Sequence, residues 1–112
     1  MKITNINNLP ELGVTHHPDI KKKVLIGNQE IPQLMMFGEA VFKPGQSVDK
    51  HVHKSMYEVF YITSGKAIFH IEGKEFEVTV GDCITIEQGE NHYQYNPFKE
   101  DVRWLYFGIA TD

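Results

Sequence analysis

The feature of this sequence that most constrains its fold is a pair of histidines separated by one residue. His51 and His53 form this pair, and Glu58 follows five positions later. In a β-strand, residues i and i+2 point to the same face, about 7 Å apart. Two imidazoles placed in this way can converge on one metal ion, each supplying a nitrogen at about 2.0–2.1 Å. A carboxylate returning on the next strand can supply a third ligand, so the stretch predicts a metal site built on β-strands.

The rest of the chain reads as short strands separated by glycine turns, with no helical period of useful length. Residues 1–20 indicate an irregular arm with at most one short strand, and His16 and His17 are expected there as surface loop residues. The clearest alternation places Ala67, Phe69 and Ile71 on one face. The expected strands cover residues 23–26, 33–43, the His51–His53 segment, 57–63, 66–72, 75–80, 83–86, 92–96 and 102–110. This pattern predicts an all-β fold, and its hairpin pairs favour a double-sheet jelly roll.

The length of 112 residues suits one domain with a single hydrophobic core. We therefore expect one domain over residues 1–112. Within it, residues 1–32 would form an N-terminal arm and outer strands, and residues 33–110 would form the barrel.

The charge and cysteine content narrow the classes of partner and compartment. Eleven basic and fifteen acidic residues give a net charge of −4, and the only cationic run is Lys21 to Lys23. Such a run is too short for much phosphate binding, so we expect neither nucleic acid nor an anionic membrane surface as a partner. A single cysteine, Cys83, fits a reducing compartment. With no apolar run of membrane-spanning length and no signal-peptide core, the prediction is a soluble cytoplasmic protein.

His92 is the candidate fourth ligand, because it begins a strand directly after the turn at residues 89–91. If the barrel closes, His92 can face the same interior as His51, His53 and Glu58. A site without thiolates does not resemble a structural zinc knot. Four protein ligands around a six-coordinate ion would leave two positions for water, dioxygen or a chelating substrate. Iron, manganese, nickel, cobalt, copper and zinc all suit these ligands, so the prediction is one divalent transition metal of open identity.

Two motifs in the chain resemble those of the cupins. The first, G(X)5HXH(X)3–4E(X)6G, is matched at every fixed position by Gly45, His51, His53, Glu58 and Gly65. The second, G(X)5PXG(X)2H(X)3N, is matched by Gly81, Gly89, His92 and Asn96, with Glu87 in place of the proline. The chain therefore resembles a small single-domain cupin from about Gln33 to Ile109.

The resemblance implies a double-stranded β-helix, or jelly-roll, barrel of six or more strands with His51, His53, Glu58 and His92 as metal ligands. It also implies a homodimer in which N-terminal strands extend the partner's sheet. It does not imply a reaction, because cupins include dioxygenases, isomerases, lyases, sensors and storage proteins.

Three further residues are candidates for work beside a metal. Tyr57 and Glu87 lie close in sequence to ligand or motif positions, and either could donate or accept a proton. Strand alternation argues against Tyr57, because the neighbouring Glu58 is expected to point inward. Gln94 shares a face with His92 and would serve as a ligand-orienting residue or as polar pocket lining.

The leading functional hypothesis is a metal-dependent enzyme acting on a small oxygen-rich or carboxylate-bearing metabolite. A dioxygenase, an isomerase and a lyase remain open alternatives. The competing hypothesis is a non-catalytic module that binds a small ligand or a metal.

Overall fold

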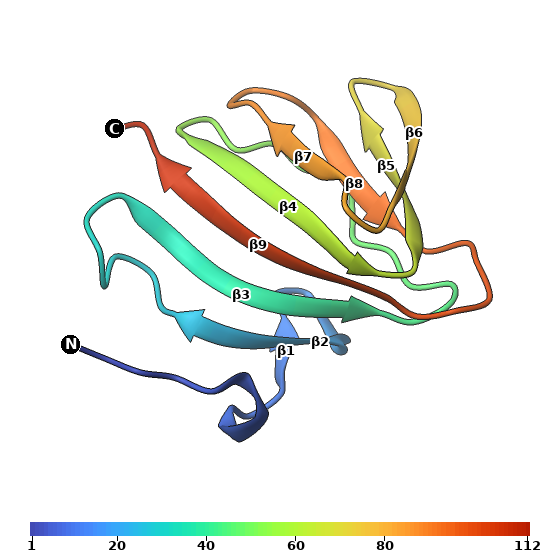
Figure 1. Cartoon of the computed structure of the whole chain (residues 1–112). Coiled ribbons are helices and arrows are strands. Elements are labelled where there is room, and N and C mark those ends of the chain that lie inside the picture. Colours follow the sequence, from blue (N-terminus) through green and yellow to red (C-terminus); the bar gives the residue numbers. More distant parts are fainter.

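The computed structural model describes residues 1–112 as two antiparallel β-sheets facing each other (Figure 1). The larger sheet has the strand order β1-β2-β3-β9-β4-β7, and the smaller one has the order β6-β5-β8. The elements are the 3-10 helix η1 (Ile6–Asn8) and the strands β1 (Leu12–Val14), β2 (His17–Ile26), β3 (Leu34–Phe42), β4 (Met56–Ser64), β5 (Lys66–Ile71), β6 (Lys74–Thr79), β7 (Cys83–Ile86), β8 (His92–Tyr95) and β9 (Val102–Ala110). The predicted all-β jelly roll is confirmed. None of the helical structure is long or apolar enough to cross a membrane.

The core lies between the two sheets and is built on aromatic side chains. Trp104 of β9 is the centre of this cluster, with ring centroids 4.6 Å from Phe42, 5.5 Å from Phe69 and 5.9 Å from Phe60. These residues come from strands of both sheets, so their packing holds the sheets face to face. All four side chains are buried, which removes a large apolar area from water.

Alternation predicts the inner face of β5 correctly and that of β6 only in part. Ala67 and Phe69 are fully buried, as expected. On β6, Val78 faces the core, but Phe76 is 47% exposed and Val80, just beyond the strand, is 58% exposed. The smaller sheet ends at β6, so this edge strand has a neighbouring strand on one side only.

The N-terminal region is more regular than the sequence suggests. The strand β2 begins at His17 and runs for ten residues, so the expectation of an irregular arm up to residue 20 is wrong in its second half. His17 is consequently a half-buried strand residue, while His16 lies in the preceding turn. The strand β2 pairs with the chain's own β3, which leaves β1 as the edge of the larger sheet.

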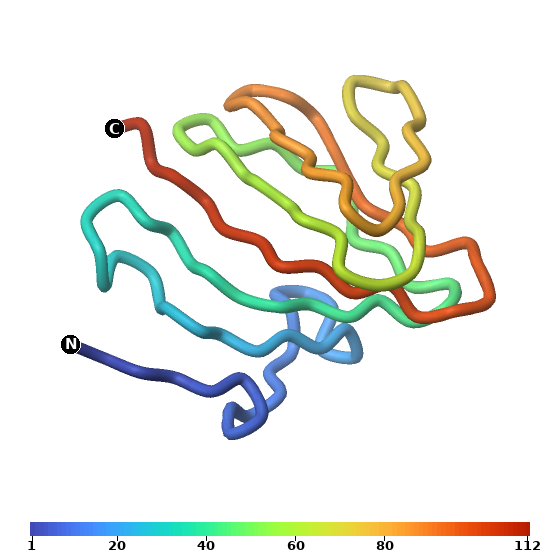
Figure 2. The backbone as a smooth tube through the Cα atoms, viewed as in Figure 1, coloured from blue at the N-terminus to red at the C-terminus, as the bar shows by residue number.

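The segment that carries His51 and His53 is an extended connection rather than a regular strand, which corrects the sequence interpretation. It passes beside β8 (Figure 2) and is bonded to this strand at intervals. His51 and His92 exchange two backbone hydrogen bonds, each 2.9 Å long. The Val48 amide donates to the Gln94 carbonyl, and the Gly89 amide donates to the His53 carbonyl. This pairing holds the segment beside β8, and the side chains of His51 and His53 both reach the same cluster.

Asn96, the last fixed position of the second motif, has a structural role. Its side chain is fully buried and donates to the carbonyl oxygens of Phe42 and Glu100, at 2.9 and 2.8 Å. The side-chain oxygen Oδ1 of Asn96 accepts a hydrogen bond from the Phe98 backbone amide at 3.0 Å. The asparagine thus ties the end of β3 to the loop before β9.

We predict that Gly65→Ala destabilises the fold by about 2–4 kcal/mol. Gly65 has a φ of +79°, and an added Cβ would overlap the carbonyl oxygen of Asp101. Gly73→Ala is the matched control: φ is +77° but the space is open, so only about 1 kcal/mol should be lost. Urea unfolding of both variants measures the difference. Equal losses would show that the contact with Asp101 is unimportant.

Candidate metal centre

The four predicted ligand residues meet at one point between the sheets. His51 and His53 come from the extended connection, Glu58 from β4 and His92 from β8. Their potential ligand atoms all lie within 4.8 Å of one another. Glu58 is central, because its Oε1 is 3.0 Å from Nε2 of both His53 and His92. Ligand atoms at about 2.0–2.2 Å from one ion can be reached from this arrangement by small side-chain movements.

Backbone carbonyls determine which nitrogen of two imidazoles is available. Nδ1 of His51 lies 2.7 Å from the Asp49 carbonyl oxygen, and Nδ1 of His92 lies 3.0 Å from the Glu90 carbonyl oxygen. A carbonyl only accepts, so both Nδ1 atoms carry a proton. In the neutral rings Nε2 therefore bears the free lone pair. This is the usual second contact of a metal-binding histidine.

The contact between His92 and Glu58 tests whether the residues fit a metal ion. If His92 is neutral, its Nε2 lone pair faces the carboxylate oxygen of Glu58, and neither atom can donate. A shared cation or an extra proton on the ring relieves this conflict. The side chain of His92 is fully buried, so water does not relieve the conflict. The residues fit a divalent cation, which would be bound by one ligand atom from each of the four side chains.

The electrostatics of the cluster favour the forms that bind metal. Burial alone would raise the pKa of Glu58, but the close contacts with His53 and His92 and the charges beside them lower it to about 2. Burial lowers the pKa of His51. The hydrogen bond to Glu58 raises the pKa of His53, so this ring binds a proton that a metal ion would displace. At neutral pH Glu58 is thus ionised and His51 is neutral.

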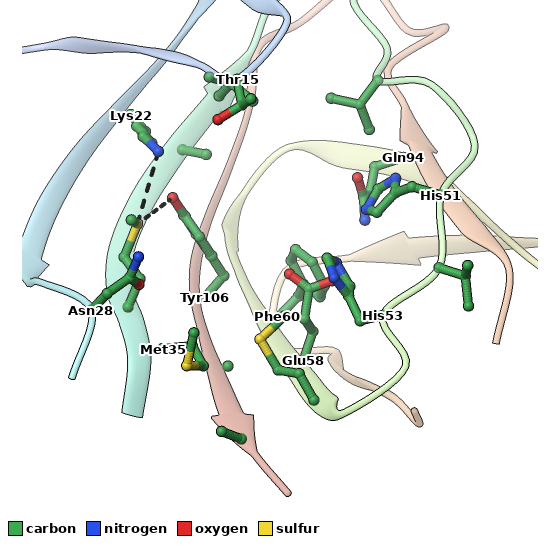
Figure 3. A pocket seen from close by; sticks show the side chains of 18 of the residues that line it. Thr15, Lys22, Asn28, Met35, His51, His53, Glu58, Phe60, Gln94 and Tyr106 are labelled. Carbon is green, nitrogen blue, oxygen red and sulfur yellow. Dashed lines mark hydrogen bonds and ion pairs between the residues drawn. The ribbon is translucent and has the colours of Figure 1, made fainter. Parts of the chain in front are cut away.

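A cavity of about 840 Å³ borders the cluster. This volume lies in the range of ligand pockets for small molecules. His51, His53, Glu58 and Gln94 lie on one side, and Lys22, Asn28 and Tyr106 lie on the other (Figure 3). The apolar part of the wall includes Phe60, Trp104, Met35 and Met56. A ligand in the cavity would therefore contact both the cluster and a partly apolar surface.

Known protein families and solved structures resemble this chain in sequence and in fold. The family model described as "Cupin domain" matches residues 38–108. This chain belongs to the cupin family.

One related sequence is the oxalate-binding protein of Thermotoga maritima. It is 33% identical over 70 residues, which cover 62% of this chain and 58% of that protein. The aligned part is thus a little over half of the relative's length.

Two solved cupin-like structures show the same fold. A predicted oxalate decarboxylase from Thermotoga maritima superposes with a TM-score of 0.89 at 22% identity, covering 97% of this chain and 99% of the other. A cupin-superfamily sugar phosphate isomerase from Silicibacter pomeroyi superposes with a TM-score of 0.84 at 17% identity, covering 98% and 76%.

The structure does not bring Tyr57 and Glu87 to the cavity of this cupin. Tyr57 alternates with Glu58 on β4 and is absent from the cavity wall. Glu87 is exposed after β7, and its backbone amide donates to a carboxylate oxygen of Glu90 at 2.8 Å. A proline could not make that bond, so the departure from the motif closes the turn in another way. A catalytic role for either residue stays a prediction.

Gln94 lines the cavity, as the sequence predicts. Two other residues of the cavity wall, Tyr106 and Lys22, are not predicted from the sequence. Tyr106 lies two residues after Trp104 on the inner face of β9, so the alternation of this strand was the signal that could have identified it. Lys22 lies two residues after the buried Ile20 on β2, but the lysine run around it looks like a solvated surface.

We predict that the metal-free cupin loses stability as the pH falls from about 4.5 toward 2. The folded state holds the pKa of Glu58 at about 2, below its ordinary value of 4.5. The unfolded chain therefore takes up a proton first, and the stabilisation present above 4.5 disappears as the pH falls through this window.

Urea unfolding of EDTA-treated protein measures this effect. The variant Glu58→Gln should show a shallower pH dependence than the wild type. Glu77→Gln is the control, because the side chain of Glu77 is exposed and makes no hydrogen bond or ion pair. The same slope in wild type and Glu58→Gln would contradict the assignment.

Proposed function

We propose that this cupin holds one divalent transition metal through His51, His53, Glu58 and His92 and binds a small oxygen-rich or carboxylate-bearing metabolite beside it. The observation that carries the proposal is the convergence of four ligand atoms within 4.8 Å at the edge of an 840 Å³ cavity. Similarity to a protein named for oxalate binding supports a carboxylate as the ligand.

Three groups of residues would contribute to binding: the metal ligands, the polar Gln94 and the apolar wall. Three neutral imidazoles and one carboxylate leave a divalent ion with a net positive charge, which favours an anionic ligand. When bound, the ion supplies a Lewis acid that holds and polarises ligand oxygens. Gln94 is 4% exposed, and its side-chain amide makes no hydrogen bond within the protein, so it is free to bond a ligand oxygen. Phe60, Met56 and Trp104 exclude water from the ligand's carbon skeleton.

The composition of the site is compatible with several reaction classes. A dioxygenase, an isomerase and a lyase all use an open metal site of this composition. Burial and the charge of Glu58 raise the pKa of Tyr106 to about 12, so at neutral pH this hydroxyl serves the cavity as a hydrogen-bond donor. The second candidate function is a cupin that binds a small ligand at its metal without transforming it, and an arrangement that only binds and orients a ligand is enough for this role.

We predict that His51→Ala and His92→Gln lower metal affinity at least about 100-fold, because each removes a direct ligand. Metal analysis after equilibration with Mn²⁺, Ni²⁺ or Zn²⁺ measures the loss, and circular dichroism checks that the β fold remains. His70→Ala is the matched control. His70 lies on the outer face of β5, where its ring stacks on Tyr93 at 4.1 Å. Full metal content in either ligand variant would remove that residue from the site.

We also predict that oxalate binds to metal-loaded protein and at least about tenfold more weakly to EDTA-treated protein, because the metal would provide the main anchor. Isothermal titration calorimetry measures both affinities. Oxygen uptake and product analysis on the iron-, manganese- and nickel-loaded forms then separate the enzyme classes from the binder. Equal affinity with and without metal would contradict the proposed function.

A further inference from the structure

Lys22 is a cation on the inner side of the barrel without an anionic partner. It lies directly opposite the buried Ala40 in the pairing of β2 with β3, so the two side chains share the inward face. None of the ion pairs in the protein includes Lys22. The lysines on either side have backbone acceptors instead: Lys21 donates to the carbonyl oxygen of Pro18 and Lys23 to that of Ile6. Lys22 alone of the three lines the cavity.

Tyr106 directs its hydroxyl to the same place. The Lys22 ammonium lies 3.9 Å from Sδ of Met36, and the Tyr106 hydroxyl lies 3.5 Å from this sulfur. A thioether is a weak acceptor, whereas an ammonium and a phenol are strong donors. Two donors therefore meet at a point where the protein provides no oxygen acceptor. Met36 is also flexible enough to move aside for one.

This pair of donors lies across the cavity from the metal ligands. In Figure 3, Lys22 and Tyr106 occupy one side, His51 and His53 occupy the other, and Phe60 lies between them. The cavity thus has two polar ends separated by an apolar stretch.

We propose that Lys22 and Tyr106 form a second binding subsite for the far end of an elongated ligand whose near end reaches the metal centre. The ligand class is a small acid with an oxyanion at each end, carboxylate or phosphate at the far end. The inference rests on the proposed function, since the near end needs the metal. An oxyanion would exchange the weak sulfur contact for two stronger hydrogen bonds, one of them charge-assisted. Oxalate, with its two carboxyl groups directly bonded, is the short reference ligand.

The test compares ligands with one and two charged ends on metal-loaded protein by calorimetry. The probes are oxalate, succinate with butyrate, glutarate with valerate, and 3-phosphoglycerate with glycerate. We expect at least one elongated dianion to bind about tenfold or more tightly than its singly charged partner, as a charge-assisted hydrogen bond predicts. The probe pair that shows this gain identifies the far group as carboxylate or phosphate.

Variants then assign the gain to the subsite. Lys22→Gln should remove it and change the singly charged partner less than about twofold, Tyr106→Phe should reduce it, and Lys22→Arg should retain part of it. Lys21→Gln is the matched control, because Lys21 is exposed and loses the same charge. No gain in wild type, or equal weakening of both ligands by Lys22→Gln, would overturn the subsite.

Metal analysis of every variant separates the two proposals. Wild-type protein that binds no metal would overturn both the proposed function and the subsite. Protein that binds metal but shows no selective effect of Lys22→Gln would overturn the subsite alone. Urea unfolding of each variant confirms that the comparison is made between folded proteins.

Discussion

The two hydrogen bonds exchanged between His51 and His92 are the interaction on which the site depends. They join the connection before β4 to the first residue of β8, and each is 2.9 Å long. Glu58 then reaches the same point from the other sheet. The cluster therefore spans both layers of the sandwich, and its geometry exists only when the sheets have closed on each other.

Buried polar atoms in the interior have hydrogen-bond partners, whereas several polar groups that face the cavity have weak partners or none. No fully buried side-chain nitrogen or oxygen atom in the protein lacks a hydrogen-bond partner, and Asn96 alone makes three bonds. Toward the cavity, by contrast, the side-chain amide of Gln94 has no hydrogen-bond partner in the protein. The Lys22 ammonium and the Tyr106 hydroxyl both contact the same acceptor, Sδ of Met36. Stable folds satisfy buried polar groups, so weakly bonded donors along one wall of the cavity are the reason we propose that a ligand binds there.

Strands marked by nearby residues in the sequence were predicted well, and segments held by distant hydrogen bonds were not. The bounds of β7 and β9 match the predicted strands at residues 83–86 and 102–110, because turns and alternation bracket both. The start of β2 was missed, since Pro18 and the lysines after it resemble a loop. The regular strand expected at His51 was wrong for a related reason: its hydrogen bonds go to β8, far away in the sequence, and only at intervals.

The sequence by itself determined the residue types and the spacing of the candidate ligands. An i, i+2 histidine pair, a carboxylate on the next strand and a histidine after a glycine turn are local features, and the motifs place them without a structure. Only the tertiary structure decided which residues form the opposite wall. Three consecutive lysines look alike in sequence, and the register that sets Lys22 against Ala40 turns that one inward. Because side chains alternate with a period of two, a shift of one residue would have turned it outward.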